Sequence, residues 1–145
     1  MEEAIVRVEH LSHRYSVDWA IRDINLEVKS KGVFGLLGSN GAGKSTTMNI
    51  ICGVLNQTEG NVWINNINLR ENPVEAKKFI GFLPQRPPLY PDMTVEEYLT
   101  YCANLRLMEP MEIGKAVERA MARCGVTHFR SRLLRNLSGG YQQRI

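Results

Sequence analysis

The N-terminal half of the chain carries the apolar patterns of β-strands. Residues 5–11 form a short apolar run, and apolar side chains alternate with Asn25 and Glu27 over residues 24–28. A period of two predicts a strand with one face in water. Residues 33–37 and 80–83 are continuous apolar segments, a pattern typical of strands buried on both faces. Between these two segments, Glu59-Gly60 and Asn65-Asn66 punctuate a predicted hairpin.

Helical signals begin after residue 43 and dominate after residue 93. They predict helices at residues 44–52, 73–78, 94–107 and 113–124. Thr94 and Glu97 have the spacing of a capping box, and Gly53 and Gly125 can end two of the helices. A connector rich in proline follows Gln85, and proline excludes regular structure there. We therefore expect a mixed α/β region at residues 1–85 and a helical region at residues 86–145.

Composition places the chain among soluble globular proteins and excludes several other classes. It has 145 residues, 43% of them hydrophobic and 23% charged, with a net charge of +3. The start of the chain lacks a signal-peptide pattern, and no apolar run approaches the ~20 residues that span a bilayer. Any membrane role would then come from a partner.

Cysteine, histidine and arginine residues give no separate functional signal. The three cysteines have no C-x-x-C spacing, which argues against a disulfide framework or a zinc site and fits a reducing cytosol. The histidines lack metal-site spacing, so we expect ordinary surface or loop residues. Five arginines between residues 119 and 135 favour a solvated helix face over a nucleic-acid patch, because no aromatic residues interleave with them.

A phosphate-binding loop is the first clear functional motif. Residues 38–45 match G-x-x-x-x-G-K-[ST] at every fixed position. Glycines let the backbone wrap an anion closely, and the following helix presents its positive end to it. Lys44 supplies a charge for the β- and γ-phosphates, Ser45 a hydroxyl for Mg²⁺, and Thr46 a donor for the α-phosphate. The alternative is a glycine-rich turn without a ligand, but the apolar segment before the motif and the helix after it favour a nucleotide site.

The last nine residues indicate which kind of nucleotide-binding protein this is. Leu137-Ser138-Gly139-Gly140-Tyr141-Gln142-Gln143-Arg144 resembles the signature motif of the ATP-binding cassette (ABC) family. In physical terms it predicts a second anion site, with Ser138 as a hydroxyl N-cap and two glycines opening a helix. In this family, that site faces the γ-phosphate held by the partner subunit's phosphate loop.

Two further positions resemble the family. Tyr15 stands where members place an aromatic ring that stacks on adenine, and Gln85 resembles the Q-loop glutamine that reaches Mg²⁺ or the attacking water. Residues 82–99 are similar to bacterial exporter-type cassettes. Ser39 stands where many relatives have proline. The resemblance therefore implies catalytic roles for Lys44 and Gln85, Mg²⁺ ligation by Ser45 and Gln85, and ATP contacts from Tyr15, Ser39, Asn40, Gly41, Ala42, Gly43, Lys44, Ser45, Thr46, Ser138, Gly139, Gly140 and Gln142.

The resemblance also implies a fold, partners and a location. The expected fold is α/β, a P-loop NTPase core with an antiparallel β region at its N-terminus and an inserted helical subdomain. Two ATPase subunits would sandwich ATP and drive a transmembrane permease, which holds them at the cytoplasmic face of the plasma membrane. No nucleic-acid partner is expected.

The family's Mg²⁺-binding aspartate and catalytic glutamate follow the signature, so this chain carries neither. We expect a fragment of a longer ABC subunit that lacks the C-terminal part of the core. It would bind ATP weakly without turnover, and a missing neighbouring strand would leave apolar segments exposed. Two alternatives are a soluble ABC ATPase of translation or chromosome maintenance and a non-catalytic module on the same scaffold. The absence of long heptads argues against a chromosome-type protein.

Overall fold

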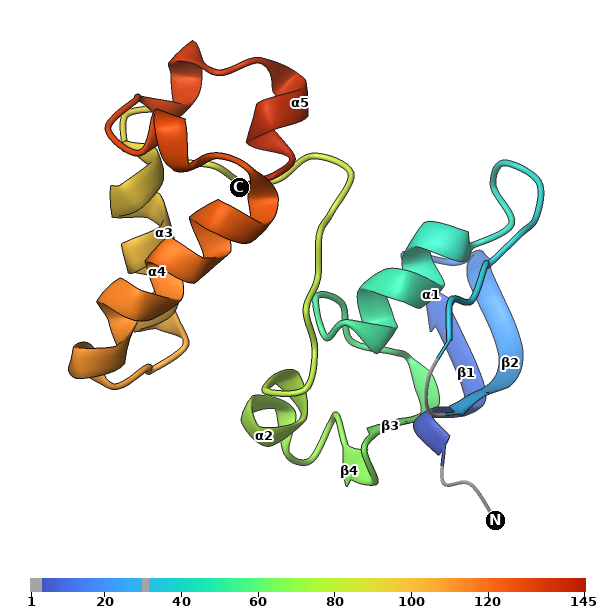
Figure 1. Ribbon diagram of the computed structural model, residues 1–145. Helices are drawn as coiled ribbons and strands as arrows, with labels where there is room; N and C mark the ends of the chain where they lie inside the picture. The colour runs from blue at the N-terminus through green and yellow to red at the C-terminus, as the bar shows by residue number, and fades with distance from the viewer. Residues whose placement is uncertain (1–3, 30–31) are drawn as a thin grey trace. The chain divides into compact units, whose positions relative to one another are not determined.

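The computed structural model describes residues 4–29 and 32–145 (Figure 1). It divides into two compact units, Met1–Phe82 and Leu83–Ile145. The division into functional regions at residues 1–85 and 86–145 stays a prediction. Within the described ranges, no helix is both long enough and apolar enough to cross a membrane.

The first unit is a four-stranded antiparallel sheet with helices packed against it. The strand order is β2-β1-β3-β4, and all three pairings are antiparallel. The strands are β1 (Ala4–Arg14), β2 (Trp19–Lys29), β3 (Glu59–Ile64) and β4 (Ile67–Asn68), and the helices are α1 (Lys44–Ile51) and α2 (Pro73–Lys77). Ile50 of α1 is buried in one cluster with Val8, Leu11 and Val62 of the strands. This shared core fixes α1, and with it the loop before α1, against the sheet.

The predicted hairpin is confirmed as β3 and β4. Asn65 and Asn66, between the two strands, both have positive φ, at 50° and 63°. Two consecutive left-handed residues suit a tight hairpin turn, and asparagine tolerates that conformation better than most residues. The strand predicted at residues 24–28 is likewise confirmed within β2.

The prediction of two strands buried on both faces is wrong. Residues 33–37 and 80–83 form no strand, and Val33 and Leu37 are 102% and 91% exposed. A strand buried on both faces needs a hydrogen-bonded neighbour and a covering layer. In the described sheet no strand pairs with either segment.

The second unit is helical, as predicted. It contains α3 (Val95–Leu105), α4 (Pro110–Cys124), α5 (Gly139–Gln142) and two 3₁₀ turns, η1 (Thr127–Phe129) and η2 (Leu134–Asn136). Val95 of α3 and Val117 and Met121 of α4 form its core together with Leu134. Gly125 ends α4 in the left-handed conformation, at φ 67°. The motif that carries the family resemblance at the end of the chain therefore rests on a small core of its own.

The predicted capping box at the start of α3 is confirmed. The backbone N–H of Glu97 donates to Thr94 Oγ1 at 3.3 Å, and the Thr94 backbone N–H donates to Glu97 Oε2 at 2.7 Å. These bonds to Glu97, first from the backbone of Thr94 and then from its hydroxyl, lower the pKa of that carboxyl group. The local sequence therefore marks the start of this helix, and the N–H groups of Val95 and Glu96 donate in addition to the carbonyl oxygens of Arg132 and Arg130.

Candidate nucleotide-binding site

The phosphate loop of residues 38–43 leads directly into α1. Gly41 and Gly43 have φ of 84° and 82°, and Gly43 is the N-cap residue of the helix. A Cβ atom at Gly43 would collide with the side chain of Ile21 and lie 2.8 Å from the carbonyl oxygen of Ala20. Only glycine meets both the dihedral requirement and the close approach to β2. The second fixed glycine of the motif is thus required by the fold.

The N-terminus of α1 is open to an anion. No side chain caps it, and its first turn contains no acidic residue. The first N–H groups of a helix have no partner within the helix and carry a partial positive charge. Ser45 is exposed, and its hydroxyl forms no hydrogen bond within the described residues. These groups fit a phosphate with a bound Mg²⁺ at the position that the motif predicts.

Lys44 folds back over the loop that precedes it. Its ammonium group donates to the carbonyl oxygens of Gly38 at 2.8 Å and Ser39 at 2.6 Å. The loop is closed further by a hydrogen bond from the Ala42 N–H to the Ser39 oxygen at 3.2 Å. An ammonium group has three protons, so one donor and the full charge remain for a ligand. Lys44 therefore both braces the loop and supplies its cation.

The structure brings Tyr15 to the phosphate-loop helix. The Tyr15 hydroxyl lies 3.2 Å from Oγ1 of Thr46, which is itself buried. Tyr15 is 66% exposed to solvent. Tyr15 is predicted to contact the base and Thr46 the α-phosphate. Their hydroxyl groups thus lie within hydrogen-bonding distance of each other. This contact had no signal in the sequence, because 31 residues separate the two positions.

The remaining predicted site residues belong to the second unit. Gln85 is exposed in a bend of the proline-rich connector. Ser138 occupies the N-cap position of α5, but its side chain makes no capping hydrogen bond, so the predicted hydroxyl cap is wrong. The backbone carbonyl of Ser138 instead accepts from the N–H groups of Tyr141 and Gln142, each at 2.9 Å. The Ser138 hydroxyl and the two exposed glycines after it, Gly139 and Gly140, are left facing solvent.

Gln142 has a structural role that the sequence did not indicate. Its side-chain nitrogen donates to the carbonyl oxygens of Leu134 at 3.0 Å and Leu137 at 3.2 Å. Both amide protons are therefore used to hold the segment before Ser138. Only the Oε1 acceptor of Gln142 remains for other contacts.

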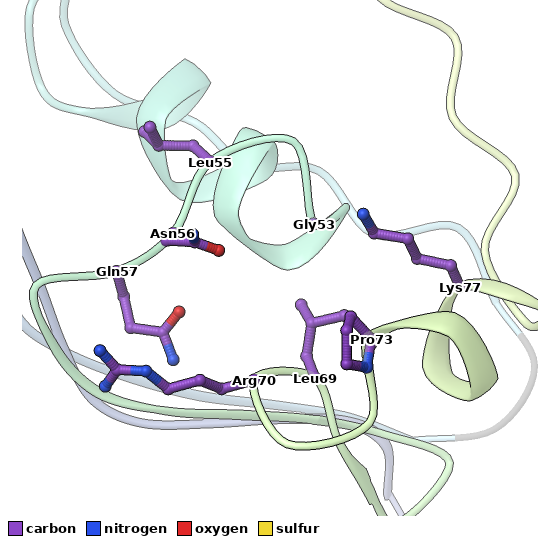
Figure 2. Close-up of a pocket in the computed structure, with 8 residues that line it drawn as sticks. All are labelled: Gly53, Leu55, Asn56, Gln57, Leu69, Arg70, Pro73 and Lys77. Carbon is purple, nitrogen blue, oxygen red and sulfur yellow. The ribbon is translucent and has the colours of Figure 1, made fainter.

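A surface pocket lies elsewhere on the first unit. Figure 2 shows it between the end of α1 and the start of α2, with a volume of about 270 Å³ that includes its open side. None of the predicted site residues lines it; its lining residues are Gly53, Leu55, Asn56, Gln57, Leu69, Arg70, Pro73 and Lys77. It lies at the opposite end of α1 from the phosphate loop. The candidate phosphate site is therefore identified by the backbone conformation and hydrogen-bond donors of the loop, and not by a pocket.

Comparison with known proteins identifies relatives along nearly the whole chain. The family model described as ABC transporter matches residues 21–145. The molybdate/tungstate import ATP-binding protein WtpC of Pyrococcus abyssi is 34% identical over 97% of this chain and 40% of its own length. The probable multidrug ABC transporter ATP-binding protein YbhF of Escherichia coli is 31% identical over 99% of this chain and 25% of its own.

Solved structures agree with these relatives. An ATP-binding subunit of an ABC transporter superimposes with a TM-score of 0.84 at 26% identity, over 97% of this chain and 58% of that one. The cbiO1 protein of Clostridium perfringens, part of the ABC transporter complex cbiONQ, superimposes with a TM-score of 0.82 at 30% identity, over 99% of this chain and 59% of that one. The chain thus spans less than two thirds of the length of each of these relatives.

Proposed function

Because the chain belongs to the ABC transporter family, we propose that it is part of an ATP-binding subunit that couples Mg-ATP binding and hydrolysis to transport. The observation that carries the proposal is the loop of residues 38–43, braced by Lys44 and opening onto the uncapped end of α1. A helix N-terminus without a side-chain cap and an ammonium group lie together in this segment.

Different residues of the first unit bind different parts of the nucleotide. The N–H groups of residues 39–46 surround the phosphates, and Lys44 contributes a charge toward the β- and γ-phosphates. Ser45 holds Mg²⁺ through its hydroxyl, and Tyr15 stacks on the base. Bound Mg²⁺ neutralises charge that develops on the phosphate oxygens. The protein's contribution is mainly positioning and electrostatic stabilisation.

The residues of the second unit act on a nucleotide held by another subunit. Ser138, Gly139, Gly140 and Gln142 are presented to the γ-phosphate in a head-to-tail dimer, and Gln85 reaches Mg²⁺ or the attacking water. A separate transmembrane permease holds the dimer at the cytoplasmic face of the plasma membrane. The similarity of residues 82–99 to exporter-type cassettes supports an exporter. Capture of a membrane subunit by the parent protein, followed by an efflux assay in vesicles, tests these assignments; isolation with a substrate-binding importer complex would refute the export direction.

This chain by itself binds Mg-ATP weakly and does not turn it over. Calorimetry on the 145-residue chain should detect ATP binding that weakens about tenfold or more in Lys44→Ala, since a hydrogen bond to a charged group contributes about 1.5–3 kcal/mol. Lys77→Ala removes the same charge at the pocket of Figure 2 and should leave ATP affinity unchanged. Equal losses in the two variants would contradict the assigned site. Steady hydrolysis by the wild-type chain, abolished in Lys44→Ala, would contradict the absence of turnover.

A further inference from the structure

His13 lies beneath the candidate base-binding ring and is not the surface histidine that the sequence suggested. It belongs to β1 and is only 7% exposed. Its Nδ1 atom lies 3.4 Å from Oγ1 of Thr58, a weak hydrogen bond. Its Nε2 atom is buried and has no hydrogen-bond partner among the described residues. A buried polar atom without a partner is rare enough in folded proteins to require an explanation.

The imidazole of His13 packs against Tyr15. The two ring centroids are 4.7 Å apart and the ring planes meet at 85°, an edge-to-face contact. Tyr15 is held a second time through its hydroxyl, which lies 3.2 Å from Oγ1 of Thr46. The residue is nevertheless 66% exposed. Two contacts therefore fix the orientation of a ring that presents most of its surface to solvent.

The contact with Thr58 explains why a histidine suits this position better than an apolar ring. The backbone N–H of Arg14 donates to Oγ1 of Thr58 at 3.2 Å. The hydroxyl proton of Thr58 is then available to donate to Nδ1 of His13. This bond limits rotation of the imidazole and so determines which part of it meets Tyr15. Phenylalanine would supply an aromatic ring without an unpaired nitrogen, but it would lose the orienting bond.

We infer that His13 is a positioning residue for nucleotide-base recognition, acting by holding the Tyr15 ring in the orientation that stacks on adenine. The inference rests on the proposed function of Tyr15 as the base-stacking residue. His13 itself contacts no nucleotide. No sequence pattern indicates this role, because it depends on burial and on a contact with Thr58, 45 residues away.

The test separates base recognition from phosphate binding. Affinities of the 145-residue chain for Mg-ATP and for Mg-tripolyphosphate, which has no base, are measured by calorimetry. Tyr15→Ala should weaken ATP binding about fivefold, the equivalent of about 1 kcal/mol, and leave tripolyphosphate binding unchanged. His13→Ala should approach the same selective loss, and the double variant should lose no more than Tyr15→Ala alone. His10→Asn changes an exposed histidine of the same strand and should change neither affinity.

Two further variants keep the inference falsifiable if His13→Ala unfolds. His13→Phe keeps a ring of similar size and should show a partial selective loss. Thr58→Val should weaken ATP binding, while Thr58→Ser, which keeps the hydroxyl, should not. Equal losses for ATP and tripolyphosphate, or losses from His13 and Tyr15 that multiply in the double variant, would overturn the inference. Absence of ATP binding by the wild-type chain would instead overturn the proposed function, and the inference with it.

Discussion

Replacement of Gly43 by alanine should destabilise the first unit much more than the same change at Gly41. Both glycines have left-handed φ, 82° and 84°, so both variants incur a conformational cost of about 1 kcal/mol. A Cβ atom at Gly41 meets nothing within 4 Å. At Gly43 it would strike the buried side chain of Ile21 and the carbonyl of Ala20, which adds an overpacking cost of about 2 kcal/mol. The expected losses are about 3 kcal/mol for Gly43→Ala and about 1 kcal/mol for Gly41→Ala.

Tryptophan fluorescence during urea unfolding measures this difference. The chain has two tryptophans, Trp19 and Trp63, and both belong to the first unit, so the signal reports on that unit. With an m-value of roughly 1 kcal/mol/M for a unit of this size, the two midpoints should differ by about 2 M. If the free energy of unfolding of the unit is below about 3 kcal/mol, Gly43→Ala should show the emission spectrum of the unfolded chain without urea, while Gly41→Ala should not. Equal midpoints would refute the argument that contact with β2 requires Gly43.

Two predictions concern the second unit. The pKa of Glu97 is lowered in the folded state, so its carboxylate stabilises the fold above the unfolded-state pKa, and this stability should be lost as pH falls through the folded-state pKa. Urea unfolding followed by circular dichroism measures the loss. It should occur in wild type and in Glu112→Gln but not in Glu97→Gln. Partial burial, and secondarily the nearby Cys102, raises the pKa of Tyr98 to about 12, and a hydrogen bond with Tyr90 raises the pKa of Tyr101. Part of the tyrosine absorbance should therefore titrate late, and Tyr98→Phe should remove the latest part of that change. Since the pKa of Tyr98 is raised in the folded state, stability should fall as pH rises from about 10 toward 12. A single step for all tyrosines near pH 10 would contradict the effect of the partial burial of Tyr98.

The features predictable from sequence are those that depend on neighbouring residues. The Thr94–Glu97 capping box, the Asn65-Asn66 turn and the helix stop at Gly125 each involve groups within a few positions of one another. Their energetics are local, so pattern and spacing suffice to locate them. The phosphate loop belongs to the same class, because its glycines, lysine and helix start are contiguous.

The features that were missed depend on distant parts of the chain. The apolar composition of residues 33–37 and 80–83 predicts strands, but a strand needs a paired neighbour, and apolar composition cannot provide one. The link between Tyr15 and Thr46 and the burial of His13 arise from sheet pairing and from the docking of α1 on that sheet. The bonds from Gln142 to two carbonyls also depend on how the chain turns before α5.

Replacing Lys44 by alanine has two effects on the loop, the loss of a charge and the loss of two hydrogen bonds to loop carbonyls, and salt can distinguish them. The ammonium group donates to the carbonyl oxygens of Gly38 and Ser39, so Lys44→Ala removes both a charge and a brace from the loop. The charge effect acts through Coulomb attraction and decreases as salt is added, whereas the loss of the brace is largely insensitive to salt. The difference in tripolyphosphate affinity between wild type and Lys44→Ala should therefore shrink between 0.05 and 0.5 M salt, to roughly half on a logarithmic scale if the two effects are similar. A difference that vanishes at high salt would show that the carbonyl contacts contribute nothing to binding, and one that does not change would show the same for the charge.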